Sequence, residues 1–475
     1  MKYIGPFFRM NTLSIEDIKG QLFHLSKEAI KTIALSSKCG ITTSFRASKK
    51  SHSNNDINTL NDFSPLLCIY KKSSPTFIHS KSSCSFNEET FKKNILPMPN
   101  AMLTLCILEL SNYYSNYSIK SNTISSFEKP YIALAKRQLD FFSKNLRNTE
   151  GIFVEKKNSS ESNTNNYTLI EEDNSFSFSD QSFMMVAYFL FSLYYEEESV
   201  SSEYREFSIQ ILNMLLEFKD SLYDVSFDEG TKILMSLNIL YSYYNEESLK
   251  KLIIDYSDFL IDKFNDKDYI NSEIDNTSIL AITLIDSYNN TGILSFKDKS
   301  DEIINKLISF YISDTGIFTK DSDKKEIKYS SEEIIFYFLA ILIYDNKEQF
   351  TSKSMISSLY RNLIVNSGIV ASWPDAPTLD EIERYKYLSL RSNDMLDELF
   401  FRMPNLQSPN STGIAPVFYK NVIYSVKKKR FSTKRNSFDS SKNMMIFYVL
   451  IHYLKNDVAS EMHFTEITEN TENND

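Results

Sequence analysis

The sequence lacks the features that mark exported or redox-active chains. Its four cysteines, Cys39, Cys68, Cys84 and Cys106, are 29, 16 and 22 residues apart, and none forms a CxxC pair. The first residues contain neither the apolar core nor the small-residue cleavage site of an export signal. We therefore expect reduced thiols and a cytoplasmic location.

Long apolar runs are also missing, and positive charge is not in excess over the chain as a whole. The most apolar runs, 334–344 and 444–454, are 11 residues long, whereas a helix needs about 20 to cross a bilayer. The net charge of −10 opposes contact with phosphate backbones. We therefore expect no membrane partner and no nucleic-acid partner.

Motifs that hold phosphates, dinucleotides or metals are absent as well. The nine glycines form no GxxxxGK[ST], GxGxxG or GxSxG motif. The five histidines and four cysteines show no metal-ligand spacing. The sequence therefore predicts no cofactor and no metal.

Aromatic residues, by contrast, are abundant and periodic. With 35 Phe and 29 Tyr but one Trp, apolar and aromatic segments recur, each after a polar residue. They predict inner helices at 100–114, 181–196, 231–244, 277–289, 332–345 and 441–455. The second reads QSFMMVAYFLFSLYY, and a helix that is apolar on every face is buried on both sides.

Amphipathic segments alternate with the inner helices. They predict outer helices at 129–147, 202–220, 246–265, 297–313 and 353–366, with charged faces that suit solvent. The segment 14–36, with Ser14 as N-cap and Asp17 three residues on, supplies a sixth. It is expected to pack against 441–455. Short apolar returns are predicted at 151–153, 225–227, 316–318 and 368–370.

Repeats of this length are typical of stacked supersecondary units. The pattern predicts one domain over 1–456, with insertions at about 37–98 and 371–438. In the first insertion, 65–70 and 76–79 are predicted to form a β-hairpin. The segments 41–62 and 155–175, and an acidic tail at 457–475, are expected to be the least ordered parts.

The order of outer helix, Gly-Ile-Phe return, polar residue and aromatic inner helix resembles the six-hairpin (α/α)6 toroid superfamily. That group includes many glycoside hydrolases, sugar epimerases, polysaccharide lyases and lanthionine cyclases. The resemblance covers 14–36 and 100–455 and rests on periodicity. It implies an all-α fold, a closed toroid of two concentric helix rings with small β-hairpin insertions. The alternative is an open α-helical repeat solenoid.

The resemblance also implies a site where the inner helices begin. An acidic mouth suits hydroxyl-rich sugars, on which carboxylates act as acid, base or nucleophile. The catalytic candidates are Asp180, Asp228 and Glu332. The substrate-binding candidates are Asn100, Glu229, Asp275, Asp439, Trp373 for ring stacking, and Arg435 from the basic run 427–435. Each candidate also has a structural alternative. The acidic residues would cap helix N-termini, Trp373 would be a packing residue, and the basic run would be a solvated loop.

Several chemistries of the superfamily do not fit the sequence. Epimerases of this fold use histidines at the mouth, and no histidine stands at a predicted inner-helix start. Lanthionine cyclases need a Cys-His pair, which is absent. The remaining hypothesis is an intracellular carbohydrate-active protein, most concretely a glycoside hydrolase, that binds a saccharide or an anionic sugar. The alternative is a non-catalytic binding or scaffold protein, which the single Trp favours. The pattern gives no oligomeric state.

Overall fold

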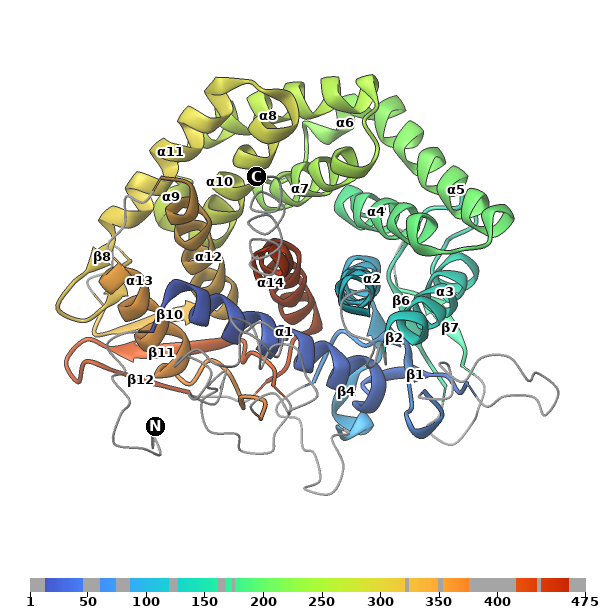
Figure 1. Cartoon of the computed structure of the whole chain (residues 1–475), viewed down its shortest axis with the longest axis horizontal. Helices are drawn as coiled ribbons and strands as arrows, with labels where there is room; N and C mark the ends of the chain where they lie inside the picture. Colours follow the sequence, from blue (N-terminus) through green and yellow to red (C-terminus); the bar gives the residue numbers. More distant parts are fainter. Residues whose placement is uncertain are drawn as a thin grey trace, which may run out of the picture.

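Six inner helices form the middle of the molecule. The computed structural model describes residues 13–45, 60–73, 86–118, 127–160, 167–172, 176–320, 324–348, 353–375, 416–433 and 437–460. Figure 1 shows the six helices grouped around the centre. They are α2 (Pro97–Ser118), α4 (Phe178–Tyr194), α7 (Phe227–Tyr243), α10 (Ile274–Thr291), α12 (Ser331–Glu348) and α14 (Ser440–Ser460), and each overlaps a predicted inner helix.

Consecutive inner helices pack against one another. Contacts join α2 to α4, α4 to α7, α7 to α10 and α10 to α12, and α14 contacts both α12 and α2. In α4 every residue from Gln181 to Ser192 is buried. This burial confirms the prediction that α4 is covered on all sides, and it explains why apolar residues occupy all faces of the helix.

A second layer of amphipathic helices lies outside the first (Figure 1). It comprises α1 (Ile15–Ser36), α3 (Glu128–Asn145), α5 (Glu198–Glu217), α8 (Glu247–Asp266), α11 (Leu294–Ser309) and α13 (Lys353–Leu359), which continues as a π-helix over Tyr360–Val365. Two short helices, α6 (Lys219–Leu222) and α9 (Tyr269–Ser272), connect the layers.

The first helix lies where the sequence predicted it. Ser14 caps α1, with its Oγ accepting a hydrogen bond of 3.0 Å from the amide of Asp17. The Asp17 side chain in turn accepts from the Ser14 backbone, so the predicted capping box is present. Helix α1 packs against α14. The predicted contact between 14–36 and 441–455 is therefore confirmed.

Short antiparallel strands lie in the segments that connect the helices. They pair as β1 (Gly40–Thr42) with β2 (Leu66–Ile69), β3 (Lys72–Ser73) with β4 (Phe91–Lys92), and β8 (Tyr311–Ile312) with β9 (Ile317–Phe318). One three-stranded sheet consists of β5 (Asn94–Ile95), β6 (Lys156–Asn158) and β7 (Leu169–Glu171). A second consists of β10 (Glu326–Ser330), β11 (Asn421–Ser425) and β12 (Arg430–Ser432). The predicted strand at 65–70 is β2, and its expected partner at 76–79 lies outside the described residues.

The predicted returns are found in three of four cases. Ile317–Phe318 is strand β9, and Phe153 and Val370 form isolated bridges with Arg147 and Phe418. A glycine with positive φ precedes each, as in Gly316 at 65°. The fourth prediction is wrong, because Ser226 caps α7 and Phe227 is its first residue. No glycine reverses the chain there, and the short helix α6 leads directly into the cap.

The segments expected to be least ordered are only partly covered by the described residues, and one of them contains regular structure. Strands β6 and β7 fall within 155–175, where little order was expected. The Lys156 ammonium is 2.5 Å from the Glu171 carboxylate across these strands. Helix α14 runs to Ser460, past the expected domain end at 456, while 461–475 and most of 41–62 lie outside the described residues. None of the helices that the structure describes is long and apolar enough to cross a membrane.

Candidate functional site

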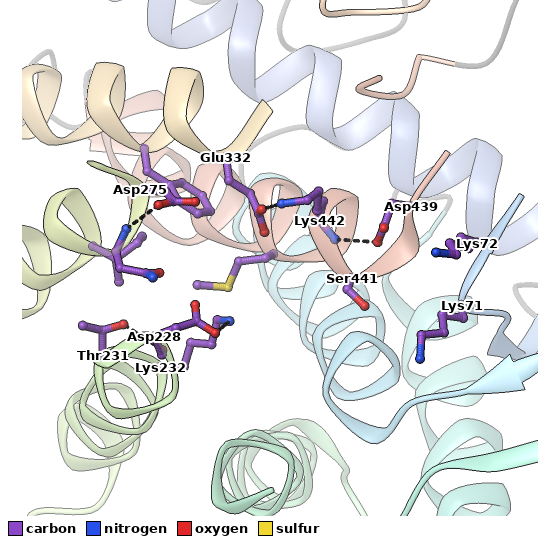
Figure 2. A pocket seen from close by; sticks show the side chains of 14 residues that line it. Lys71, Lys72, Asp228, Thr231, Lys232, Asp275, Glu332, Asp439, Ser441 and Lys442 are labelled. Carbon is purple, nitrogen blue, oxygen red and sulfur yellow. Dashed lines mark hydrogen bonds and ion pairs between the residues drawn. The ribbon is translucent and has the colours of Figure 1, made fainter. Parts of the chain in front are cut away.

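A pocket of about 320 Å³ opens where four of the inner helices begin. Figure 2 shows charged side chains of both signs pointing into it. Its carboxylates are Asp228, Asp275, Glu332 and Asp439, and its lysines are Lys71, Lys72, Lys232 and Lys442. Thr231, Asn276 and Ser441 add neutral polar groups, and Ile279, Phe336 and Met445 are its apolar lining residues.

The carboxylates meet because each occupies nearly the same position in its repeat. Asp228, Asp275 and Glu332 are the second residues of α7, α10 and α12, and Asp439 directly precedes α14. Negative charge is stabilised at a helix N-terminus by the free amides and the helix dipole. Because these four helices pack in succession, their first turns bring the carboxylates to one place.

Two lysines of the pocket neutralise two of its carboxylates. Lys232, one turn after Asp228, holds its ammonium 2.7 Å from that carboxylate. Lys442 forms an ion pair with Glu332 of the neighbouring helix α12. The expected acidic mouth is therefore corrected to a mouth of mixed charge. The sequence did contain a signal for both lysines, since they follow Asp228 and Asp439 by four and three residues and share their helix faces.

Asp275, like Asp439 and unlike Asp228 and Glu332, has no lysine bound to it among the ion pairs of the described residues. Its carboxylate accepts a hydrogen bond of 3.1 Å from the amide of Asn276. Burial raises the pKa of Asp275, and the nearby Glu333 carboxylate adds to this, against the opposing effects of that hydrogen bond and of Lys442. A carboxyl group with a raised pKa that faces a pocket is suited to donating a proton.

Asp180 and Glu229 lie outside the lining of the pocket and cap neighbouring helices. Asp180 accepts a hydrogen bond of 2.7 Å from the Met98 amide in the first turn of α2. Glu229 accepts from the Ser177 hydroxyl at 2.6 Å and from the Ser179 amide at 3.3 Å, at the start of α4. Each carboxylate thus satisfies amides of the preceding inner helix.

The pKa of Asp180 is nevertheless perturbed. Burial raises it to about 7; the Met98 hydrogen bond and Lys232 act against this, and the Glu229 and Glu155 carboxylates reinforce it. Since Lys232 lines the pocket, Asp180 lies within electrostatic reach of the pocket wall without being part of it.

Two of the remaining candidates from the sequence, Asn100 and Trp373, are not among the lining residues of the pocket. Asn100 is fully buried, and its amide donates to Ile69 and Leu96 while its oxygen accepts from the Ile69 amide. Trp373 is 6% exposed and lies edge-on to Tyr360, with ring centroids 6.4 Å apart, which is the placement of a packing residue. Arg435 lies outside the described residues.

A second charged cluster occupies the later turns of α2 and α14. Glu109, which is fully buried, pairs with Lys455 and lies 2.9 Å from Nδ1 of His452. Burial alone would raise the pKa of Glu109, but Lys455 and His452 outweigh it and hold that pKa at about 2. Within the described part of the chain, no group of three or more His, Cys, Asp or Glu side chains is arranged to hold a metal ion.

Comparison with known proteins gives structural likeness only. The sequence matches no protein-family model and no curated protein. Similar solved structures include a GH76 alpha-mannanase of Bacteroides thetaiotaomicron, with 10% identity, coverage of 77% of this chain and 90% of that one, and a TM-score of 0.41. The cellobiose 2-epimerase of Bacillus thermoamylovorans has 10% identity, coverage of 76% and 89%, and a TM-score of 0.46.

A termite endoglucanase from Nasutitermes takasagoensis has 12% identity, coverage of 92% of this chain and 99% of that one, and a TM-score of 0.46. All three are (α/α)6 toroid folds, the superfamily that the sequence resembles. The likeness concerns the fold alone. The site is therefore defined by the packing of this chain alone.

Proposed function

We propose that the chain is a carbohydrate-active protein, most concretely a glycoside hydrolase, with the charged pocket as its site. The observation that carries the proposal is Asp275, a carboxyl group with a raised pKa in the pocket wall. Asp228 and Glu332, two carboxylates with lysine counter-ions, line the same pocket. Hydrolysis of a glycosidic bond needs such a pair, one carboxylic acid and one carboxylate.

In this proposal Asp275 is the general acid. It would protonate the oxygen of the leaving group as the glycosidic bond breaks. Asp228 or Glu332 would act on the other side of the sugar, either as nucleophile or as the base that activates water. Asp439 and the hydroxyl of Thr231 would bind sugar hydroxyl groups.

The proposal takes the helices as a closed (α/α)6 toroid in a single domain, with the stretches 37–98 and 371–438 as insertions. The contacts of α14 with both α12 and α2 support this arrangement. Closure matters for function, because it holds the first turns of the inner helices around one mouth. The volume of about 320 Å³ is at the small end of the range of about 300–1,000 Å³ for ligand pockets, so the pocket suits a short saccharide.

The test is Asp275→Asn measured against a panel of aryl glycosides and oligosaccharides. We expect the variant to lose at least 100-fold in kcat, because general acid catalysis contributes about 10²–10⁴-fold. The matched control is Asp262→Asn on the outer helix α8, an exposed carboxylate, which should leave turnover unchanged. Turnover of any glycoside by Asp275→Asn at the wild-type rate would contradict the role of Asp275.

A second candidate function is non-catalytic binding of a saccharide. It is favoured by the ion pairs that occupy Asp228 and Glu332, since these carboxylates are already engaged. In that case the wild-type chain would bind sugars, as seen by calorimetry, without hydrolysing any member of the panel. Measurable wild-type hydrolysis that Asp275→Asn abolishes would exclude this second candidate.

A further inference from the structure

The end of the pocket formed by Lys71 and Lys72 is held in place by the start of α14. The amide and hydroxyl of Ser440 both donate to the carbonyl oxygen of Lys71, at 2.9 Å and 2.7 Å. The backbone of Lys72 forms an antiparallel bridge with that of Asp439. These contacts fix a short segment of the first insertion against an inner helix, so the two lysines have a defined place in the pocket wall.

Some charged side chains of the pocket have ion-pair partners among the described residues, and others have none. Lys232 and Lys442 are paired with Asp228 and Glu332. The Lys71 ammonium lies 3.3 Å from each carboxylate oxygen of Glu155, which is not a lining residue. Among the residues that the structure describes, no carboxylate lies within ion-pair distance of Lys72. Within the described part of the chain, Lys72 is thus a lining cation without a counter-ion.

The surroundings of Lys72 suit an anionic group. Figure 2 places Lys71, Lys72 and Ser441 at the same end of the pocket, away from Asp228 and Asp275. The Ser441 hydroxyl lines the pocket and can donate a hydrogen bond. Lysine binds carboxylates and phosphates as a point charge. Asp439, at the same end, can accept from a hydroxyl group of the ligand.

We propose that the ligand of the pocket is an acidic sugar, whose carboxylate or phosphate oxygens lie against Lys72 and Ser441 while its ring lies beside Asp228, Asp275 and Glu332. The inference rests on the proposed function, because it assigns the substrate class of the same site. It divides the pocket into an anion-binding end, on the first insertion and α14, and a reacting end, on α7, α10 and α12.

The test compares glucuronic acid, glucose 6-phosphate and neutral glucose by calorimetry on the full chain at constant ionic strength. We expect the acidic sugars to bind at least tenfold more tightly than glucose. In Lys72→Met this preference should fall to near one, and Lys72→Arg should restore most of it. The control is Lys92→Met. Lys92 is an exposed lysine of β4 that stands opposite Lys72 of β3 in the strand register and does not line the pocket. It should keep the preference.

The outcomes separate the inference from the proposed function. Equal wild-type binding of glucose and the acidic sugars, or a preference that persists in Lys72→Met, would overturn the acidic-sugar inference while the saccharide site stands. No binding of any of the three sugars, together with no hydrolysis of the glycoside panel, would overturn both. Tighter binding of glucuronic acid than of glucose 6-phosphate, or the reverse, would identify the anion as a carboxylate or a phosphate.

Discussion

The side-chain amide of Gln181 and the backbone of Phe153 exchange two hydrogen bonds. The Phe153 amide donates to Oε1 of Gln181 at 3.0 Å, and Nε2 of Gln181 donates to the Phe153 carbonyl at 2.8 Å. Gln181 is the fourth residue of α4, and Phe153 is part of the return that precedes it. The same two-way exchange links Asn100 with Ile69 and Asn443 with Phe418, again from the fourth helical residue.

The amide pairing predicts a large stability loss in Gln181→Leu. Leucine would leave a buried N–H and a buried C=O of Phe153 without partners, and each costs about 1–3 kcal/mol. We expect a loss of about 3 kcal/mol in the free energy of unfolding, measured by urea denaturation. The control Gln210→Leu, at an exposed position of α5, should change it by less than about 0.5 kcal/mol. Equal losses in both variants would contradict the role of the pairing.

The helices could be predicted from the sequence because their signals are local. The apolar run Phe183–Phe191 indicates a buried helix because it is long, lacks glycine and proline and contains one β-branched residue, and the spacing of charged residues indicates an outer helix. The strand pairings could not be predicted in this way. Strand β10 at 326–330 pairs with β11 at 421–425, and nothing in either pentapeptide encodes a partner so distant in the chain.

Part of the pocket lining follows from the same local signals. The sequence places Asp228, Asp275 and Glu332 in the first turns of their helices and Asp439 just before its helix, and the structure brings these four carboxylates together in one pocket. Lys71 could not be selected, since it reaches the pocket through a non-local bond from Ser440. The capping roles of Asp180 and Glu229 depend on which neighbouring helix their side chains face, and this is set by packing between helices rather than by sequence position.

Asp180 should make stability depend on pH between its unfolded and folded pKa values. The pKa is raised from 3.8 to about 7, so the folded state holds the proton more tightly, and stability is lost as pH rises through this window. Asp180→Asn keeps an oxygen acceptor for the Met98 amide but cannot ionise. We expect little change at pH 4 and a gain on the order of 1 kcal/mol at pH 8, after allowing for solvent screening.

Thermal or urea unfolding of Asp180→Asn at several pH values from 4 to 8 measures this effect. Asp262→Asn on α8 is the control, and its stability should follow the wild-type pH profile. A wild-type profile that is unchanged by Asp180→Asn would show that this carboxyl group ionises normally in the folded chain. A loss of several kcal/mol at both ends of the range would indicate that asparagine does not replace the cap.

Glu109 should contribute to unfolding in acid. Its pKa is lowered from 4.5 to about 2, so its contribution is present above about pH 4.5 and is lost as pH falls towards 2. The groups that face it are Lys455, His452, Cys106, Tyr194, Tyr243 and Tyr448. Glu109→Gln removes the partner of the buried Lys455 ammonium, and we expect a loss of roughly 3 kcal/mol at pH 7.

Urea titrations at pH 7, 4 and 3 test the role of Glu109. The difference between wild type and Glu109→Gln should shrink as pH falls, because protonation removes the wild-type advantage. Glu206→Gln, at an exposed position of α5, should run parallel to wild type throughout. A difference that stays constant with pH would mean that the lost stability comes from packing and not from the charge of Glu109.

Trp373 offers an intrinsic probe, because it is the only tryptophan in the sequence. Its ring is 6% exposed and lies edge-on to Tyr360, whose hydroxyl donates to Gln21 of α1 at 2.6 Å. The indole is therefore packed against Tyr360 of the π-helix and is not among the lining residues of the pocket. We expect blue-shifted emission and weak quenching by acrylamide in the native chain, and strong quenching in urea.

The same signal separates packing from sugar stacking. If Trp373 packs in the core, saturating glucose or glucuronic acid should leave its emission unchanged even when calorimetry reports binding. Trp373→Phe, which keeps an aromatic ring in the layer, should then retain the wild-type affinity while losing on the order of 1 kcal/mol of stability. The contrary result is a ligand-dependent shift of the emission together with weaker sugar binding in Trp373→Phe. Only a ring in contact with the ligand would produce both, so this result would identify Trp373 as a stacking platform.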